Sequence, residues 1–163
     1  MKTIRIADII TNDVLNGQGI CTSVWVQGCP HHCPGCHNPE TWDFNGGTLR
    51  SPDSVISEVL ELMGKNGVSR NLSILGGEPL CYANEEFTRN LAAAVKKKYP
   101  KAKVFCWTGS TLEVLKQKYD INVLLKDIDV LIDGPFIQEQ RDITLPLRGS
   151  TNQRIIYLKK ENK

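Results

Sequence analysis

The sequence has no long hydrophobic run, no marked excess of charge of either sign, and no low-complexity tract or linker. No apolar run approaches the roughly 20 residues that span a bilayer. Residues 1–16 mix both charges and do not contain the apolar core of a signal peptide. Lys and Arg number 20 against 18 Asp and Glu, so the net charge of +2 gives no reason to expect nucleic acid or a membrane as a partner. We therefore expect a single cytoplasmic domain covering residues 1–163.

A second pair of closely spaced cysteines is also absent. Six cysteines are present, and three of them, Cys29, Cys33 and Cys36, lie in one loop with gaps of three and then two residues. A structural zinc site usually takes two separated pairs, and a C-x-x-C thiol–disulfide oxidoreductase has no need of a third cysteine. A 4Fe-4S cluster has four iron corners and is usually held by four thiolates. Three cysteines in one loop therefore predict a 4Fe-4S cluster with one iron open to another ligand.

Zinc remains the alternative occupant of this loop. The loop also holds three histidines, and any one of them would complete a tetrahedral site with the three cysteines. The other cysteines stand alone in the sequence. Cys21 and Cys106 lie in apolar runs, where burial as small hydrophobes explains them. A packing role explains Cys81 at least as well as a chemical one.

Strand and helix signals alternate along the chain. We expect strands at residues 4–10, 22–27, 71–75, 103–107 and 130–132, and helices from Pro52 with core positions to Met63, at 85–99 and at 111–119. Such alternation favours an α/β fold with a mainly parallel sheet and right-handed crossovers. Residues 28–47 form a long loop rich in Pro, Gly, His and Cys. A loop of this length in a compact domain is usually functional.

A glycine pair follows the strand expected at 71–75. Gly76 and Gly77 allow a sharp turn with no Cβ between the backbone and a ligand. The carbonyls of this turn, together with Glu78, would receive an ammonium group, although such a pair alone is more often just a turn. Ligands gather at the carboxyl ends of parallel strands. The cysteine loop, this turn and Thr108-Gly109 all fall there, so we expect them to face one site.

The cysteine spacing, taken with Gly76-Gly77-Glu78-Pro79, resembles the radical S-adenosylmethionine (radical SAM) family. The resemblance implies that Cys29, Cys33 and Cys36 hold the cluster, and that the amino and carboxylate groups of S-adenosylmethionine chelate the open iron. It also implies which residues bind this cofactor: Gly35, Cys36, His37, Gly76, Gly77, Glu78, Thr108, Gly109 and Asp133.

Further motifs across nearly the whole chain are similar to the branch of this family that activates anaerobic (class III) ribonucleoside-triphosphate reductases. These motifs are Asn16-Gly17-Gln18-Gly19, Trp107-Thr108-Gly109, Asp133-Gly134-Pro135-Phe136 and Arg148-Gly149-Ser150-Thr151-Asn152-Gln153. Where that branch commonly has an aromatic residue after the third cysteine, this chain has His37.

The likeness implies a fold and an activity. The fold would be a partial, open (βα) barrel of the radical SAM type, which leaves room for a large protein substrate. The activity would be reductive cleavage of S-adenosylmethionine and transfer of the radical to a glycine of the anaerobic ribonucleoside-triphosphate reductase, with electrons from a low-potential donor such as flavodoxin.

Three alternatives stay open. The chain would instead activate another glycyl-radical enzyme, serve as a zinc-bearing interaction module, or act as a radical SAM enzyme on a small molecule. The last is disfavoured because 163 residues leave little room for a dedicated substrate domain.

Overall fold

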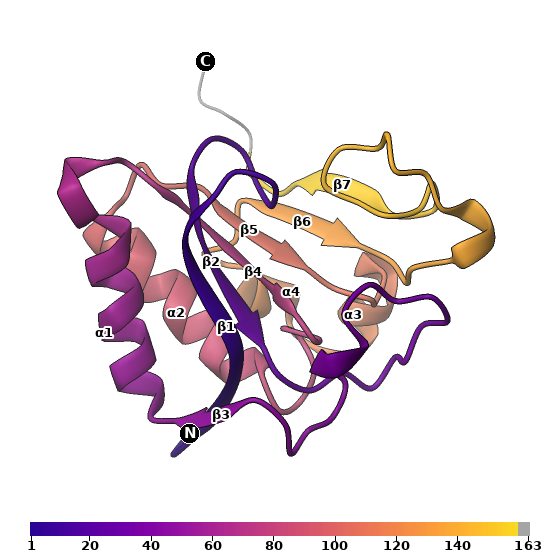
Figure 1. Ribbon diagram of the computed structural model, residues 1–163, viewed down its shortest axis with the longest axis horizontal. Coiled ribbons are helices and arrows are strands. Elements are labelled where there is room, and N and C mark those ends of the chain that lie inside the picture. The colour runs from indigo at the N-terminus through magenta and orange to yellow at the C-terminus, as the bar shows by residue number, and fades with distance from the viewer. Residues whose placement is uncertain (160–163) are drawn as a thin grey trace.

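The computed structural model describes residues 1–159, which build one seven-stranded sheet with helices against it (Figure 1). The strands are β1 (Ile4–Asp13), β2 (Cys21–Val26), β3 (Thr48–Arg50), β4 (Asn71–Gly76), β5 (Val104–Trp107), β6 (Val130–Asp133) and β7 (Arg154–Tyr157). The helices are α1 (Pro52–Met63), α2 (Glu85–Lys98), α3 (Leu112–Lys118) and α4 (Ile121–Leu124), with 3-10 turns η1 (Pro39–Thr41), η2 (Lys65–Gly67) and η3 (Gln138–Gln140).

The sheet is parallel in the middle and antiparallel at both edges. Its strand order is β3-β1-β2-β4-β5-β6-β7. The four strands β2, β4, β5 and β6 run parallel, whereas β1 pairs antiparallel with β2 and β3, and β7 pairs antiparallel with β6. Because β3 and β7 are the two ends of this order, the sheet is open. The expectation of a mainly parallel α/β sheet is confirmed for its centre.

The three predicted helices, α1, α2 and α3, begin and end within about one residue of the predicted positions. Ser51 caps α1, since its side chain accepts a hydrogen bond from the Ser54 N–H, and Pro52 occupies the first helical position. In α2, acidic residues fill the first turn and three lysines fill the last, as the helix dipole favours. The sequence patterns missed β3, α4 and β7. Each has only three or four residues.

The two faces of the sheet carry unequal cores. The face toward the helices holds the main cluster, in which strand residues such as Val24, Ile74 and Cys106 pack with Val59 of α1 and Phe87 of α2. The opposite face has a smaller cluster centred on three buried strand residues, Phe105, Val130 and Ile132. Burial of the first cluster supplies most of the hydrophobic stabilisation. The face away from the helices, with its smaller cluster, can therefore contain cavities.

Within residues 1–159, no helix combines the length and the apolar character needed to cross a membrane.

Candidate functional site

Loops at the carboxyl ends of four neighbouring parallel strands line one cavity. The cysteine loop follows β2, the glycine turn follows β4, Thr108-Gly109 follows β5 and Gly134 follows β6. The cavity has a volume of about 170 Å³. Of the residues predicted from the sequence, those that line it are Cys29, Cys33, Cys36, Gly76, Gly77, Glu78, Thr108 and Gly109. The structure thus brings together side chains from segments about 80 residues apart.

Backbone hydrogen bonds fix the start and the turn of the cysteine loop. Gly28 and Cys29 donate N–H bonds to the carbonyls of Thr41 and Trp42, at 2.8 and 3.1 Å. Cys36 N donates to Cys33 O at 3.0 Å, which closes a turn between the second and third cysteines. The loop therefore presents its thiols from a held backbone, as a metal-binding loop requires.

The three thiols are free and half-buried. Burial raises the pKa of the Cys29 thiol to about 11, because desolvation disfavours the thiolate. A bound cation reverses such a shift, since the thiol must lose its proton to become a ligand. The Asn38 N–H donates to Cys36 Sγ at 3.4 Å. Hydrogen bonds of this kind to ligand sulfur tune iron–sulfur clusters.

The donor set fits a cluster held at three corners, because three thiols from one loop face one cavity. No three His, Cys, Asp or Glu side chains among residues 1–159 lie close enough together to hold a single metal ion.

The glycine turn packs directly on the start of the cysteine loop. Gly77 N donates to Val26 O, and Glu78 N donates to Gly28 O, both at 2.8 Å. Gly76 has φ +107°, and a Cβ there would lie 2.6 Å from Val26 O. A Cβ on Gly77 would collide with the carbonyl oxygen of Gly28. Both glycines are thus required by the close approach of two backbones.

Glu78 is 2% exposed, and donors from three loops surround its carboxylate. Oε1 accepts from Leu80 N at 2.9 Å, and Oε2 accepts from Gly109 N at 2.7 Å. The Nε2 atom of His31 lies 2.6 Å from the same Oε2. Sequence reasoning considered this histidine only as a ligand for zinc. No spacing pattern could pair it with a residue 47 positions away.

Asn84 is another buried residue that sequence reasoning missed. Its side-chain amide donates to the carbonyls of Gln27 at 3.1 Å and Glu78 at 3.0 Å. It therefore ties the end of β2 to the glycine turn. An asparagine before a helix is normally taken as a cap, but no capping hydrogen bond from its side chain is found here.

Asp133 lies outside the lining of the cysteine cavity. It is fully buried, and its carboxylate accepts hydrogen bonds from Leu112 N at 2.7 Å and from Arg154 Nε at 3.0 Å. Arg154 also donates to Glu113. The carboxylate thus joins β6 to β7 and to the start of α3.

Gly35 and His37 are likewise absent from the lining of the cysteine cavity. Gly35 has φ +78°, in the left-handed region that glycine tolerates, and a Cβ there would lie 2.9 Å from the Gln138 side chain. The exposed His37 ring lies 5.3 Å from the ring of Phe136, in a tilted arrangement. His37 lines the neighbouring cavity instead.

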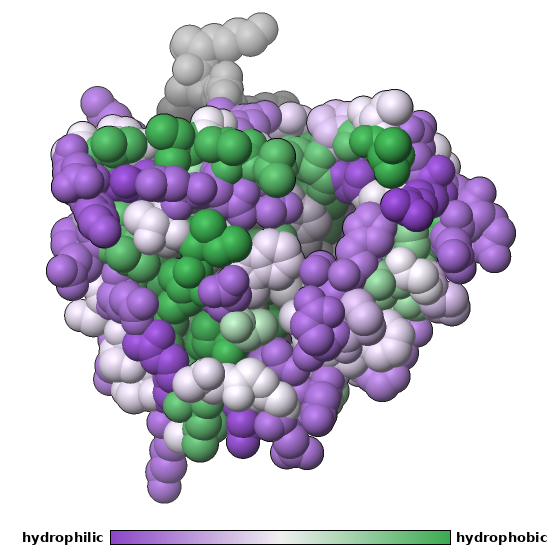
Figure 2. Space-filling view, viewed as in Figure 1, coloured by the Kyte–Doolittle hydropathy of each residue, from purple (hydrophilic) through white to green (hydrophobic). Residues whose placement is uncertain are grey.

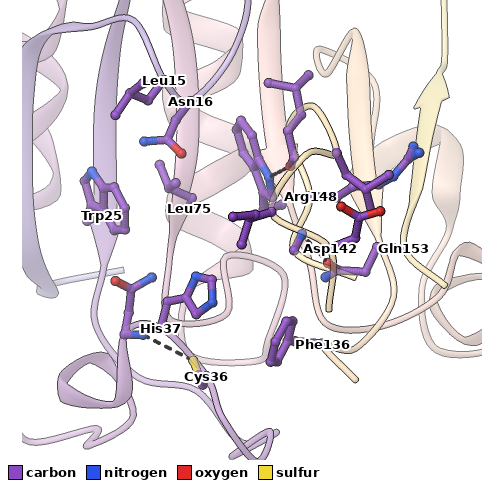
Figure 3. Close-up of a pocket in the computed structure, with 16 residues that line it drawn as sticks. Leu15, Asn16, Trp25, Cys36, His37, Leu75, Phe136, Asp142, Arg148 and Gln153 are labelled. Carbon is purple, nitrogen blue, oxygen red and sulfur yellow. Dashed lines mark hydrogen bonds between the residues drawn. The ribbon is translucent and has the colours of Figure 1, made fainter. Parts of the chain in front are cut away.

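This second cavity has a volume of about 420 Å³ and shares six lining residues with the first: Cys36, Asn38, Leu75, Trp107, Phe136 and Gln153. Figure 3 shows Cys36, His37 and Phe136 at one end of it, with Leu15, Asn16 and Trp25 on one side and Asp142, Arg148 and Gln153 on the other. Figure 2 shows hydrophobic residues along the upper edge and at the upper right of the molecule, with a further group left of the centre.

The Arg148–Gln153 motif builds one wall of this cavity. Gln153 Oε1 accepts from the N–H groups of Gly149 and Ser150, at 2.9 and 3.2 Å, and its Nε2 donates to Gly134 O at 3.0 Å. The indole of Trp107 donates to Leu147 O at 2.7 Å. These bonds fix the loop before β7 against the ends of β5 and β6.

Comparison with known proteins shows the family of this chain. Residues 15–156 match the model of a protein family described as a 4Fe-4S single cluster domain. An anaerobic ribonucleoside-triphosphate reductase-activating protein of Vibrio cholerae is 40% identical over 146 residues, which cover 88% of this chain and 91% of that protein. The protein of the same name from Haemophilus influenzae is 38% identical, with 88% and 91% covered, and that of phage T4 is 37% identical, with 88% and 87% covered.

The family match covers most of the chain, and the relatives match along nearly their full length. This chain therefore belongs to the family of anaerobic ribonucleoside-triphosphate reductase-activating proteins, and it carries their 4Fe-4S single cluster domain.

Proposed function

We propose that this chain is a radical SAM activase. Cys29, Cys33 and Cys36 hold a 4Fe-4S cluster, and S-adenosylmethionine binds beside it at the carboxyl ends of β4 and β5. The observation that carries the proposal is the single cavity lined by all three thiols and by the glycine turn. The open sheet is then the partial barrel of this family.

A cluster held by Cys29, Cys33 and Cys36 would supply one electron for the reductive cleavage of S-adenosylmethionine to methionine and 5'-deoxyadenosine, with the hydrogen atom taken from a glycine of the partner. The protein binds, orients and shields these groups. Gly76 and Gly77 leave backbone carbonyls accessible to the methionine ammonium group, and Glu78 places a negative charge behind them. Gly35, Cys36 and His37 flank the rest of the cofactor, with Thr108 and Gly109 facing them.

Asp133 has a different place in the proposed site. Its carboxylate accepts hydrogen bonds from Arg154 and from the start of α3, so its role is to stabilise the end of β6. No acid–base pair is needed for the chemistry.

The second cavity suits the protein substrate. The relatives are named as activating proteins of the anaerobic ribonucleoside-triphosphate reductase, and we propose the corresponding reductase as the partner here. The cavity begins at Cys36, and an exposed aliphatic side chain stands beside it on each side, Leu15 and Ile143, both 82% exposed. A glycine-bearing loop of the reductase would enter here, and an electron donor such as flavodoxin would reduce the cluster.

The proposal is tested with anaerobically reconstituted protein, its own reductase, a reductant and S-adenosylmethionine. We expect 5'-deoxyadenosine, methionine and an electron paramagnetic resonance doublet on the reductase that collapses when the glycine α-carbon is deuterated. Cys33→Ala should lose iron and the doublet. Cys81→Ala removes a buried thiol that does not line the cavity and should keep both.

Three results would count against the proposal. Zinc in place of iron and acid-labile sulfide would favour the interaction module. Cofactor cleavage with a doublet only on another glycyl-radical enzyme would overturn the named partner. Cofactor cleavage coupled to a small molecule would overturn the protein substrate.

A further inference from the structure

The contact between His31 and Glu78 joins the cysteine loop to the glycine turn. His31 Nε2 lies 2.6 Å from Glu78 Oε2. A carboxylate oxygen accepts hydrogen bonds, and this separation is that of a hydrogen bond donated by a ring N–H at Nε2. We propose that His31 is a positioning residue, which fixes the cysteine loop relative to the S-adenosylmethionine pocket. This inference rests on the proposed function and adds to it a residue and a coupling between the two binding loops.

Three strand ends meet at one carboxylate oxygen. His31 comes from the loop after β2, Glu78 from the loop after β4, and Gly109 from the loop after β5. The Oε2 atom of Glu78 forms hydrogen bonds with both His31 Nε2 and Gly109 N. Glu78 is 2% exposed, and these contacts determine where its carboxylate lies. Any shift of the cysteine loop is thereby transmitted to the turn that would receive the methionine ammonium group.

The loop after β5 leaves space for the imidazole ring of His31. A Cβ on Gly109 would lie 2.6 Å from His31 Cδ2 and 2.9 Å from its Nε2. Unlike Gly76, Gly109 does not have a left-handed backbone, so its lack of a side chain is explained by the ring that packs over it. Two independent features, a hydrogen bond and a steric fit, thus point to the same ring position.

The other two histidines of the loop have different neighbours. His32 stacks on Trp42, with ring centroids 4.6 Å apart, and His37 contacts Phe136. The His31 side chain is 25% exposed, whereas Glu78 is buried. A partly exposed histidine adds little to a hydrophobic core, so its removal should affect the carboxylate more than the fold.

The test uses protein carrying its reconstituted cluster, kept anaerobic, in five forms. These are the unaltered chain, His31→Ala, His31→Gln, Gly109→Ala and His32→Asn. Glutamine retains an N–H donor near the position of Nε2, and Gly109→Ala displaces the ring from the opposite side. His32→Asn is the matched control, because asparagine tolerates the left-handed backbone of that position (φ 47°). Each form is assayed for iron and sulfide, for S-adenosylmethionine affinity by calorimetry, and for the change that S-adenosylmethionine makes to the spectrum of the reduced cluster.

We expect equal iron and sulfide in all five forms. His31→Ala and Gly109→Ala should bind S-adenosylmethionine about tenfold more weakly, and their spectra should change only at correspondingly higher cofactor concentration. His31→Gln should recover most of the affinity, and His32→Asn should match the unaltered chain. Recovery by glutamine is the result that a merely structural role would not produce.

The inference is overturned by full affinity in His31→Ala with its iron intact, or by an equal loss in His32→Asn. Loss of iron from His31→Ala would also overturn it, because His31 would then hold the cluster or the fold. If the unaltered chain carries its cluster but does not bind S-adenosylmethionine, the proposed function fails as well. The two failures are therefore distinguishable.

Discussion

Two buried carboxylates stand at neighbouring strand ends, and their partners give them different roles. Glu78 follows β4 and is 2% exposed, whereas Asp133 ends β6 and is fully buried. Backbone N–H groups and His31 surround Glu78, all from loops that line the cysteine cavity. Asp133 instead pairs with the guanidinium of Arg154 on the edge strand β7. Both carboxylates are thus buried at the end of a strand, but only that of Glu78 lines the cavity.

The difference shows what a sequence pattern at a strand end can establish. Both residues were expected to contact the cofactor because of the resemblance to the radical SAM family, and both lie at the ends of apolar strands. A strand end places a side chain near the site but does not choose its partner. Arg154 lies 21 residues beyond Asp133, in a strand that the sequence did not predict.

The largest expected effect is on the free energy of unfolding, when Asp133 is substituted. Asp133→Ala removes the acceptor for Leu112 N and one partner of Arg154, and losing these hydrogen bonds to a buried carboxylate should lower the free energy of unfolding by about 3 kcal/mol. Urea unfolding of the purified chain measures this. Asp133→Asn, which keeps the size and one acceptor, should lose less. A decrease in the free energy of unfolding below about 1 kcal/mol would mean that the carboxylate does not hold β6, β7 and the start of α3 together.

The next effect is on the cofactor, at Glu78. Glu78→Gln removes the negative charge behind the glycine turn and should weaken S-adenosylmethionine binding roughly thirtyfold, about 2 kcal/mol. Iron content should stay unchanged, because the three thiols are untouched. Anaerobic calorimetry with parallel iron analysis checks both. If Asp133→Asn weakened cofactor binding as much as Glu78→Gln, the contrast between the two carboxylates would disappear.

The smallest effect is a dependence of stability on acid pH. Hydrogen bonds from Arg154 lower the pKa of Glu113 from 4.5 to about 2. A carboxyl with a lowered pKa stabilises the fold fully above its unfolded value and loses that contribution as the pH falls from about 4.5 toward about 2. Glu113 is fully exposed, so the gain is small.

Stability should therefore fall less steeply in Glu113→Gln than in the unaltered chain between about pH 5 and about pH 2. Urea midpoints of both chains across this range provide the measurement. Parallel curves would show that Arg154 serves Asp133 alone.

The centre of the fold was predictable because its signals are local. The apolar strand at Asn71–Gly76 and the helix cap at Ser51 follow from neighbouring residues. The edge strand β3 was not predictable, since its three residues are largely exposed and its pairing with β1 depends on residues more than 40 positions away.

In the site, too, the local features were predictable from the sequence and the long-range contacts were not. Cysteine spacing and paired glycines are local patterns, and the structure places both beside one cavity. The hydrogen bonds from His31 to Glu78 and from Asn84 to Gln27 join residues 47 and 57 positions apart. Only the packed fold shows such partners, because no sequence period links them.

The most direct test of the central claim is a hyperfine measurement on the reduced cluster with S-adenosylmethionine labelled with nitrogen-15 at its amino group. If Cys29, Cys33 and Cys36 hold three corners and the glycine turn delivers the methionine end to the fourth, the spectrum should contain a coupling from that nitrogen. The coupling should weaken in Glu78→Gln at equal cofactor concentration. A fully loaded cluster with bound cofactor and no nitrogen coupling would contradict the placement of both in one site.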